Sequence, residues 1–483
     1  MKKILFATTA LTMVLIPSAA FAMPPVIAAV ASVAGTLLMG GTLTAIGSLT
    51  GFGLAFAHVA IQSALGYAMQ SLNKTGKVGT AGRGYDVNSV GPSLPHQIIY
   101  GEAKTGGAVF YQATSGVDNL YLHRCVAFAG HEIEGFQAFY FNDDLLILDA
   151  SGNVTSPTQY VGFARITFHT GTDTQAADAD LVSEVTEWTT AHQAKGIAYA
   201  HVRYTYDPLN EAFPDGVPTL KARIKGRKIY DPRTETTAWS DNPALIIRDY
   251  ILADFGLEDV ETSVNDPLIT QAANICDDTV GSAKRYTCNG AFLLDAEPES
   301  VIQAITASMG GLFWYAQGKW ACKAAKYTTP TIHFDEDDLR SSLSISTRNS
   351  RRENFNTVRG VYRGAETNWQ ETDYTEVTDL VAVADDGGEV ASEIPLLFTS
   401  TDVMAQRIAN IALKRNRLQQ SMSATFGLKG LQVGIGDTIR FSNDRAGFTE
   451  KIFEVNDWRF AMGDDMDLGV QLLLREMNSE VFE

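Results

Sequence analysis

Hydrophobic residues follow two different patterns along this chain. From Ile4 to Asn73, apolar and small residues continue without one Asp, Glu, Lys or Arg. From residue 94 onwards, short apolar stretches alternate with turn residues, at a spacing of about eight to twelve residues that is typical of β-barrels and β-sandwiches. The pattern therefore predicts a mainly β body, of the α+β class, behind an apolar, Gly- and Ala-rich helical N-terminal segment.

The apolar N-terminal segment divides into two parts. Residues 1–22 have the order of a secretory signal, with two lysines, an apolar run and an A-x-A cleavage site at residues 20–22. Residues 23–74 follow, and the stretch from Val26 to Thr50 is long enough to cross the hydrocarbon core of a membrane. Two interpretations stay open for this part: helices buried in an oligomer interface or channel, or a segment that enters a membrane at some stage.

Turn residues and changes of pattern divide the rest of the chain. Residues 75–93 are rich in Gly, Ser and charged residues, as in a linker. We expect a first β-barrel-like domain at 94–235, an inserted α+β domain at 236–334, and a second region at 335–483 that ends in another small β-barrel. The predicted strands include 96–100, 108–113, 120–127, 138–141, 165–168, 197–206, 220–229, 421–428, 437–442, 450–460 and 466–474.

Capping residues locate three helices. Asp241-Asn242-Pro243 places a cap before a proline at the first helical position, and apolar residues continue from there to Phe255. A second helix is predicted from Glu297 to Met309, where two glycines end it. A third is predicted to begin after Ser400 or Thr401 and to end at Leu418.

Composition and charge exclude several classes of protein. Lys and Arg number 38 and Asp and Glu number 56, so the net charge is −18, which is unfavourable for tight binding of nucleic acid. Apolar residues make up 45% of the chain, too many for global disorder. Four cysteines in 483 residues exclude a fold built on disulfides, and in a cytoplasmic setting Cys276 and Cys288 should be free thiols.

Motifs that carry chemistry are absent from the sequence. His131 begins the segment HEIEG, which lacks the second histidine of a HExxH zinc site. There is no CxxC, no G-x-S-x-G and no Walker A motif, and Cys125 near His123 lies in a stretch that reads as a buried strand. We therefore predict no catalytic residue, no cofactor-binding residue and no metal ligand, and we expect that the protein is not an enzyme.

One charged segment allows a functional interpretation. Asp335, Glu336, Asp337 and Asp338 form an acidic run, and arginines that include Arg351 and Arg352 follow shortly after it. Acidic runs are most often solvated turns, and nearby arginines most often pair with acids of a neighbouring strand or subunit. The functional alternative is that these residues lie at an interface or line a channel, where carboxylates repel a passing polyanion.

Several segments together resemble the tail-tip hub proteins of long, flexible-tailed bacteriophages, also called tip attachment or central tail hub proteins. The likeness rests on their order and spacing over about 390 residues, since each one alone is weak. The segments are LPHQIIYGEAKTGG (94–107), GHEIEGFQAFYFNDDLLIL (130–148), 220–234, 239–257, 285–320, NFNTVRGVY (354–362), 405–420, GLQVGIGDTIRF (430–441) and 472–478.

The resemblance implies a virion protein that acts by its geometry. It implies a homotrimer with two barrel domains in each subunit, so that six barrels match the sixfold tail tube above them. The implied partners are the distal tail protein, the C-terminus of the tape measure protein, and tip or fibre proteins, while phage DNA passes through without specific binding. Assembly is expected in the host cytoplasm, at the distal end of the tail, and no catalytic residue comes with the family.

The sequence departs from that family in two ways. It ends soon after the predicted second barrel, without a C-terminal fibre region, so we expect receptor binding to be delegated to another protein. It also begins with the apolar segment, and export would conflict with assembly in the cytoplasm; residues 4–73 are instead expected to line the channel or to contact a membrane. Two alternatives stay open: a secreted or membrane-anchored β-rich binding protein of a bacterium, and a tail-associated peptidoglycan hydrolase.

Overall fold

The computed structural model describes residues 84–91, 94–209, 211–348, 350, 353–462 and 468–482. Contacts divide the chain into Met1–Met69 and Gln70–Glu483, and the described residues all belong to the second unit. The predicted segments 1–22 and 23–74, most of the linker 75–93, and both Arg351 and Arg352 lie outside the described residues. Among the residues described, no helix combines the length and the apolar character needed to cross a membrane.

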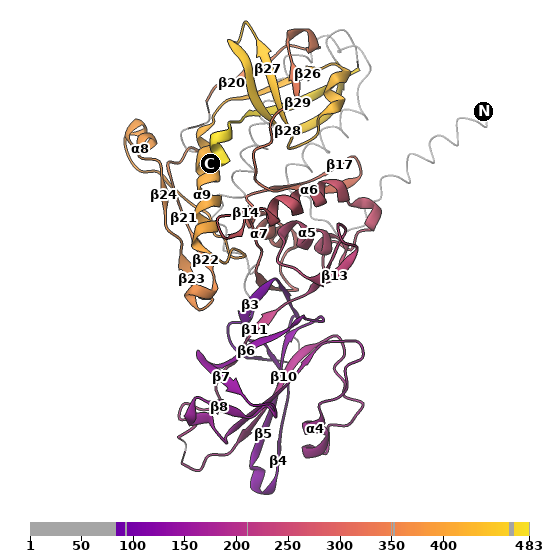
Figure 1. The fold of residues 1–483 in the computed structure, drawn as a ribbon, viewed down its shortest axis with the longest axis vertical. Helices are drawn as coiled ribbons and strands as arrows, with labels where there is room; N and C mark the ends of the chain where they lie inside the picture. Colours follow the sequence, from indigo (N-terminus) through magenta and orange to yellow (C-terminus); the bar gives the residue numbers. More distant parts are fainter. Residues whose placement is uncertain are drawn as a thin grey trace, which may run out of the picture. The chain divides into compact units, whose positions relative to one another are not determined.

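The first β region is a sandwich of two five-stranded sheets, whose inner faces share one hydrophobic core (Figure 1). Alternate residues of each strand point into this core, as in β10, where Ala200, Val202 and Tyr204 lie on the inner face. The strand order of the first sheet is β1 (Ser89–Val90), β4 (Ala108–Ser115), β5 (Tyr121–Ala129), β10 (Ala198–Thr205), β9 (Ala164–Thr170). The strand order of the second sheet is β3 (Glu102–Thr105), β11 (Leu220–Lys225), β6 (Gly135–Phe141), β7 (Asp144–Leu148), β8 (Val154–Ser156).

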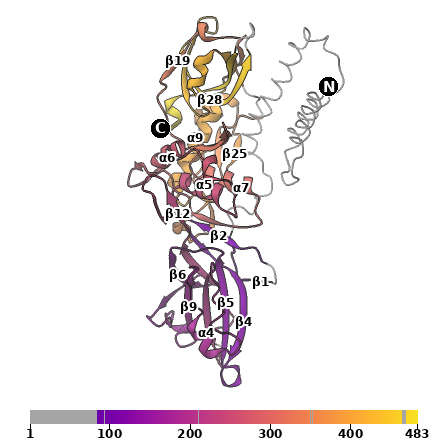
Figure 2. The ribbon, with the colours of Figure 1, turned by 90° about the vertical axis from the view of Figure 1, so that its right-hand side faces the viewer.

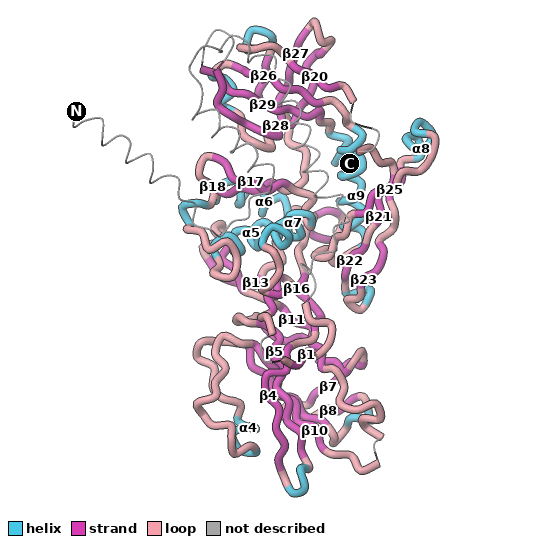
Figure 3. The backbone as a smooth tube through the Cα atoms, turned by 180° about the vertical axis from the view of Figure 1, so that it is seen from behind, coloured by secondary structure: helices cyan, strands magenta, loops and turns pink. Residues whose placement is uncertain are grey.

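The middle region is built from helices and short strand pairs around a second core (Figure 3). Asn242 and Asn265 cap the first two helices by accepting backbone N–H bonds, and prolines stand in the first turn of all three. The helices are α5 (Pro243–Leu252), α6 (Asp266–Asp277) and α7 (Pro298–Ala307). Three antiparallel strand pairs accompany them: β12 (Lys228–Asp231) with β13 (Thr236–Trp239), β14 (Thr279–Val280) with β15 (Ala283–Lys284), and β17 (Leu312–Ala316) with β18 (Lys319–Lys323).

The same core continues into the residues after 353. Thr401 caps α9 (Asp402–Arg417), and the buried face of this helix, with Ala405 and Ile408, joins the core that α5 and α7 form. Short strands and one more helix accompany it: β21 (Thr357–Arg359), β24 (Val377–Thr378), β25 (Ala391–Glu393), β22 (Val361–Arg363), β23 (Glu371–Asp373) and α8 (Leu380–Asp386).

A six-stranded sheet near the C-terminus encloses a third core, rich in phenylalanine (Figure 1). Its strand order is β19 (Ile332–Phe334), β27 (Thr438–Asn443), β28 (Phe448–Met462), β29 (Leu468–Glu476), β26 (Ser421–Phe426), β20 (Ser344–Ser346). The α+β, mainly β class is therefore confirmed, and the three capped helices lie where the sequence places them.

The prediction of closed barrels needs a correction. Within the described residues the sheets stay open, because closure requires hydrogen bonds between the edge strands. A single isolated bridge, Asn153 with Arg165, links the two sheets of the sandwich. In the C-terminal sheet the edge strands β19 and β20 pair with β27 and β26, and the described sheet has no ladder between the two edges. The first region is thus a sandwich, and the last is a curled open sheet.

One short strand joins the first two cores. β2 (Gln97–Tyr100) pairs antiparallel with β16 (Gly290–Leu293), almost two hundred residues further on (Figure 2). Successive side chains of a strand point to opposite sides, so Tyr100 enters the middle core whereas Ile99 enters the core of the sandwich. Asp249 of α5 accepts hydrogen bonds from the Tyr100 hydroxyl at 2.6 Å and from Arg227 Nε at 2.8 Å. This carboxylate therefore fixes the strand, the helix and the segment after β11 to one another.

Replacing Asp249 with Asn should destabilise the protein by about 1.5–3 kcal/mol, because it leaves the Arg227 guanidinium, which is largely buried, without its counter-charge. The urea midpoint and the melting temperature of the full chain measure the effect. Glu132→Gln is the matched control, since it removes one carboxylate from an exposed pair with Lys228 and should change stability by about 0.5 kcal/mol or less. Equal effects of both variants would contradict the linking role of Asp249.

Candidate functional site

The predicted acidic segment forms the turn that follows β19. Asp335 Oδ1 accepts a hydrogen bond from the Asp337 backbone N–H at 3.1 Å, and Asp338 Oδ2 accepts one from the Asp335 backbone N–H at 3.2 Å. This reciprocal arrangement is a capping box for the short 3₁₀ turn Glu336–Asp338. Asp338 also forms an ion pair with Lys429, with 2.6 Å between Nζ and Oδ2. Two of the four acids thus shape the turn itself.

The other two acids of this segment are exposed. Glu336 accepts a hydrogen bond from the Asp444 backbone N–H at 2.8 Å, so it also holds a neighbouring loop, whereas Asp337 presents its carboxylate to solvent. Arg351 and Arg352, which the sequence groups with this run, lie outside the described residues. A place at a channel wall or an interface stays a prediction for all six residues.

A second cluster, which the sequence analysis missed, lies on the outer face of the sheet β4-β5-β10-β9. Odd-numbered residues of three adjacent strands meet there, among them His123 of β5, Thr167 of β9 and His201 of β10. The segment 171–197, with α4 (Ala179–Glu184), covers this face and forms a small core with Leu181, Trp188 and the strand residues Cys125 and Tyr199. We call the polar residues beneath this cover the His–Asp cluster.

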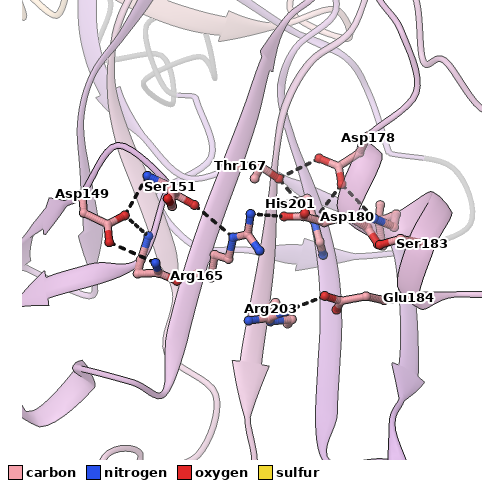
Figure 4. Close-up of polar contacts among 12 residues, drawn as sticks. Asp149, Ser151, Arg165, Thr167, Asp178, Asp180, Ser183, Glu184, His201 and Arg203 are labelled. Atoms are coloured by element: carbon pink, nitrogen blue, oxygen red, sulfur yellow. Dashed lines mark hydrogen bonds and ion pairs between the residues drawn. The ribbon is translucent and has the colours of Figure 1, made fainter.

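Asp178 is the centre of the His–Asp cluster (Figure 4). Its side chain is almost completely buried, at 1% exposure, and four donors surround its two oxygens. Oδ2 lies 2.6 Å from Thr167 Oγ1 and 3.0 Å from His169 Nε2, and Oδ1 lies 3.1 Å from His201 Nδ1 and 3.0 Å from the backbone N of Leu181, which Asp178 caps. Burial alone would raise the pKa of this carboxyl, but the hydrogen bonds from the two histidines and Thr167 hold the pKa well below its usual range.

A chain of hydrogen bonds continues from His201 towards the surface. His201 Nε2 lies 3.0 Å from His123 Nδ1, and His123 Nε2 lies 2.7 Å from the hydroxyl of Ser115. With neutral imidazoles every bond is satisfied when each Nδ1 carries the proton and donates towards Asp178. Burial, and then the neighbouring His201, lower the pKa of His123 to about 4, so His123 is neutral at pH 7.

Two arginines border the cluster (Figure 4). Arg165 forms an ion pair with Asp180, with 3.1 Å between the side chains, and donates to the Ser151 carbonyl. Arg203 forms an ion pair with Glu184 at 2.5 Å, and Glu184 also lies 3.7 Å from His123 Nε2. The segment that carries α4 is therefore attached to the sheet by ion pairs as well as by its small core.

The thiol beside these histidines is not a nucleophile. Cys125 is fully buried, and burial, followed by the charge of Asp178, raises the pKa of its thiol well above the usual value. Cys276 and Cys288 are free thiols, as the sequence predicts. His131 of the HEIEG segment is structural, because its Nε2 accepts from the Ile99 backbone N–H at 3.0 Å and its Nδ1 lies 2.7 Å from the Glu132 carbonyl.

The signal for the His–Asp cluster was present in the sequence but weak. His123 and Cys125, Thr167 and His169, and His201 and Arg203 are polar or small residues at alternate positions of three predicted strands. Such spacing also fits one solvated face of a sheet. The strands that bring these residues together are adjacent only in the folded sheet, and Asp178 comes from a loop whose course the sequence does not indicate.

Comparisons with known proteins connect the chain with phage tails. A model of the phage tail protein family Phage-tail_3 matches residues 297–458, about a third of the chain. The baseplate hub protein pb3 of Escherichia phage T5 is 23% identical over 474 residues, which include 82% of this chain and 49% of pb3. The chain thus spans about half the length of that relative.

Solved structures show a similar fold. A chain from the virion of a native gene transfer agent particle has a TM-score of 0.58 and 15% identity, and the match covers 92% of this chain and 98% of that one. The tail protein of Neisseria meningitidis MC58 matches 80% of this chain at 9% identity with a TM-score of 0.32, too low to add to the argument. The likeness to phage tail hub proteins that the sequence indicates is confirmed: the family model is named for a phage tail protein, pb3 is named as a baseplate hub, and the chain with the similar fold belongs to a virion.

The buried histidines predict how stability depends on pH. Burial lowers the pKa of both His123 and His131 to about 4, whereas a histidine of an unfolded chain titrates near 6.5. Between these values the unfolded state binds more protons, so the free energy of unfolding should fall as the pH falls from about 6.5 to 4.5, by up to about 1.4 kcal/mol per pH unit for each histidine.

Urea unfolding of the full chain at several pH values in this range measures the slope. His131→Gln should roughly halve the part of the slope that the two histidines cause, while His96→Gln, at an exposed position, serves as the control. A stability that stays constant or increases towards pH 4.5 would show that the two imidazoles are not held neutral by the fold.

Proposed function

We propose, from its similarity to phage tail hub proteins, that three copies of this chain close into a ring at the distal end of a virion tail. The ring joins the sixfold tube to a threefold tip and forms the conduit through which DNA leaves the particle. The observation that carries this proposal is the match, over most of the chain, to a protein named as a baseplate hub.

The organisation of the fold supports the symmetry part of the proposal. Each chain contains two extended β regions, the sandwich of two five-stranded sheets and the six-stranded C-terminal sheet. Three copies therefore supply six β regions, which is the number that a sixfold ring above them requires. The partners that follow are the distal tail protein on the tube side, the C-terminus of the tape measure protein within, and tip or fibre proteins beyond.

The charge of the chain supports the conduit. A net charge of −18 leaves little surface on which DNA phosphates could bind tightly. Asp337 and Glu336 are exposed in a turn that the capping box makes stiff, so they can present negative charge at a fixed place. Repulsion from such a wall lets DNA slide past without specific binding.

Residues 4–73 are the part of the chain suited to contact a membrane during ejection. They contain no charged residue, and a stretch of them is long enough to cross a hydrocarbon core. In the assembled ring, three such segments would lie together, next to the end of the tape measure protein. This role is separate from ring formation, which the β regions supply.

The mass of the purified full chain in solution tests the ring. Light scattering should give three times the mass of one chain, and negative-stain images should show a ring with a central hole. A monomer at micromolar concentration that is also absent from the tail ends of virions would refute the proposal.

Removal of residues 4–73 from the phage-encoded chain tests the membrane role. Tails should still assemble, because the two β regions that are proposed to form the ring lie outside this segment, but infectivity should fall by orders of magnitude. Adsorbed particles should retain their DNA, which staining of intact capsids measures. Wild-type infectivity of the shortened form would exclude the role, and loss of tails would mean that the segment is needed for assembly instead.

A further inference from the structure

The His–Asp cluster contains a buried carboxyl group without a permanent counter-charge. The Asp178 side chain is 1% exposed. Its described hydrogen-bond donors are Thr167, two histidines and the Leu181 backbone, and none of these carries a permanent positive charge. A carboxylate buried in this way is stabilised by a cation beside it. A protonated histidine or a bound metal ion can supply that charge.

A second carboxylate lies at the same place. Asp180 is in the first turn of α4, and ligand atoms of Asp178, Asp180 and His201 all lie within 4.8 Å of one another. Over the whole cluster, three carboxylates (Asp178, Asp180 and Glu184) face two guanidinium groups, those of Arg165 and Arg203.

The spacing of these atoms suits coordination of a metal ion. Two ligands about 2.0–2.1 Å from a tetrahedral Zn²⁺ are about 3.3 Å apart. His201 Nδ1 and Asp178 Oδ1 are 3.1 Å apart, so a small displacement would allow an ion to replace the hydrogen bond between them. One imidazole nitrogen and two carboxylates form a donor set that first-row divalent metals accept, with water at the remaining positions.

The surroundings of the three residues are those that orient metal ligands. Thr167 holds Asp178, and Arg165 holds Asp180 through one side of its carboxylate. His201 uses its second nitrogen, Nε2, towards His123. A ligating histidine normally donates its other N–H to such a partner, which fixes the ring.

We propose that Asp178, Asp180 and His201 bind a divalent transition-metal ion of the Zn²⁺ class. Binding reverses the hydrogen-bond chain: the proton on His201 Nδ1 leaves to water, His201 Nε2 takes the proton of His123 Nδ1, and His123 Nε2 takes a proton that comes from water by way of the Ser115 hydroxyl, which stays protonated. Both imidazoles stay neutral, and one proton is released for each one taken up. The ion attaches the segment 171–197 to the sheet, a role independent of the proposed ring.

Isothermal titration of ZnCl₂ into the full chain, purified without a histidine tag, tests the site. One ion should bind per chain, and saturating Zn²⁺ should raise the melting temperature. Asp180→Asn should weaken binding by about ten-fold or more, and His201→Gln should weaken it further, with circular dichroism confirming that each variant is folded. Asp173→Asn, at an exposed position of the same segment, is the matched control and should bind as the wild type does.

A further variant separates a ligand role of Asp180 from a merely structural one. Arg165→Gln breaks the same ion pair as Asp180→Asn but leaves all three ligands and removes a competing cation. It should therefore bind Zn²⁺ at least as tightly as the wild type. Absence of Zn²⁺ binding up to millimolar concentration would overturn the proposal, as would equal losses in Asp180→Asn and Arg165→Gln. With Co²⁺ as a second probe, visible absorption that depends on His201 would support it.

Discussion

The four-residue strand β2 contributes side chains to two hydrophobic cores at once. All four residues of β2 are buried, and alternate side chains enter the sandwich on one side and the helical middle region on the other. The paired strand β16 does the same, with Ala291 in one core and Phe292 in the other. Neither core is complete without this two-stranded ribbon, so the first and middle regions are energetically coupled through it.

The crowding around β2 explains residues that would otherwise seem arbitrary. A side chain at Gly226 would meet the carbonyl oxygen of Ile99 at 2.1 Å, because the chain leaving β11 passes directly over the ribbon. Gly101 has a φ of +60°, which lets the chain turn from β2 into β3. Glycine at both places lets the backbones approach closely enough for the Arg227 N–H to bond the Ile99 carbonyl.

Local signals predicted many of the elements but not how they meet, and three helices, α4, α6 and α8, were missed. Thr401 and Asn242 cap helices as expected, and the strand predicted at 96–100 is β2. The partner of that strand lies almost two hundred residues away, a pairing that periodicity cannot reveal. The predicted strand 220–229 is in fact two, β11 and β12, since the passage over β2 at Gly226 interrupts it. Barrel closure failed as a prediction because it depends on edge pairing, which has no local signature.

The two attachments in the first region differ in the kind of interaction that maintains them. The ribbon β2–β16 is held by backbone hydrogen bonds and two apolar cores, neither of which titrates near neutral pH. The segment with α4 is held by a small core and by the hydrogen bonds among Asp178, His123 and His201. Acid acts on both attachments, because burial lowers the pKa of His123 beneath this segment and of His131, which accepts the Ile99 backbone N–H of β2, to about 4. A ligand that binds in the His–Asp cluster, by contrast, acts on the segment with α4 and leaves the backbone hydrogen bonds of the ribbon in place.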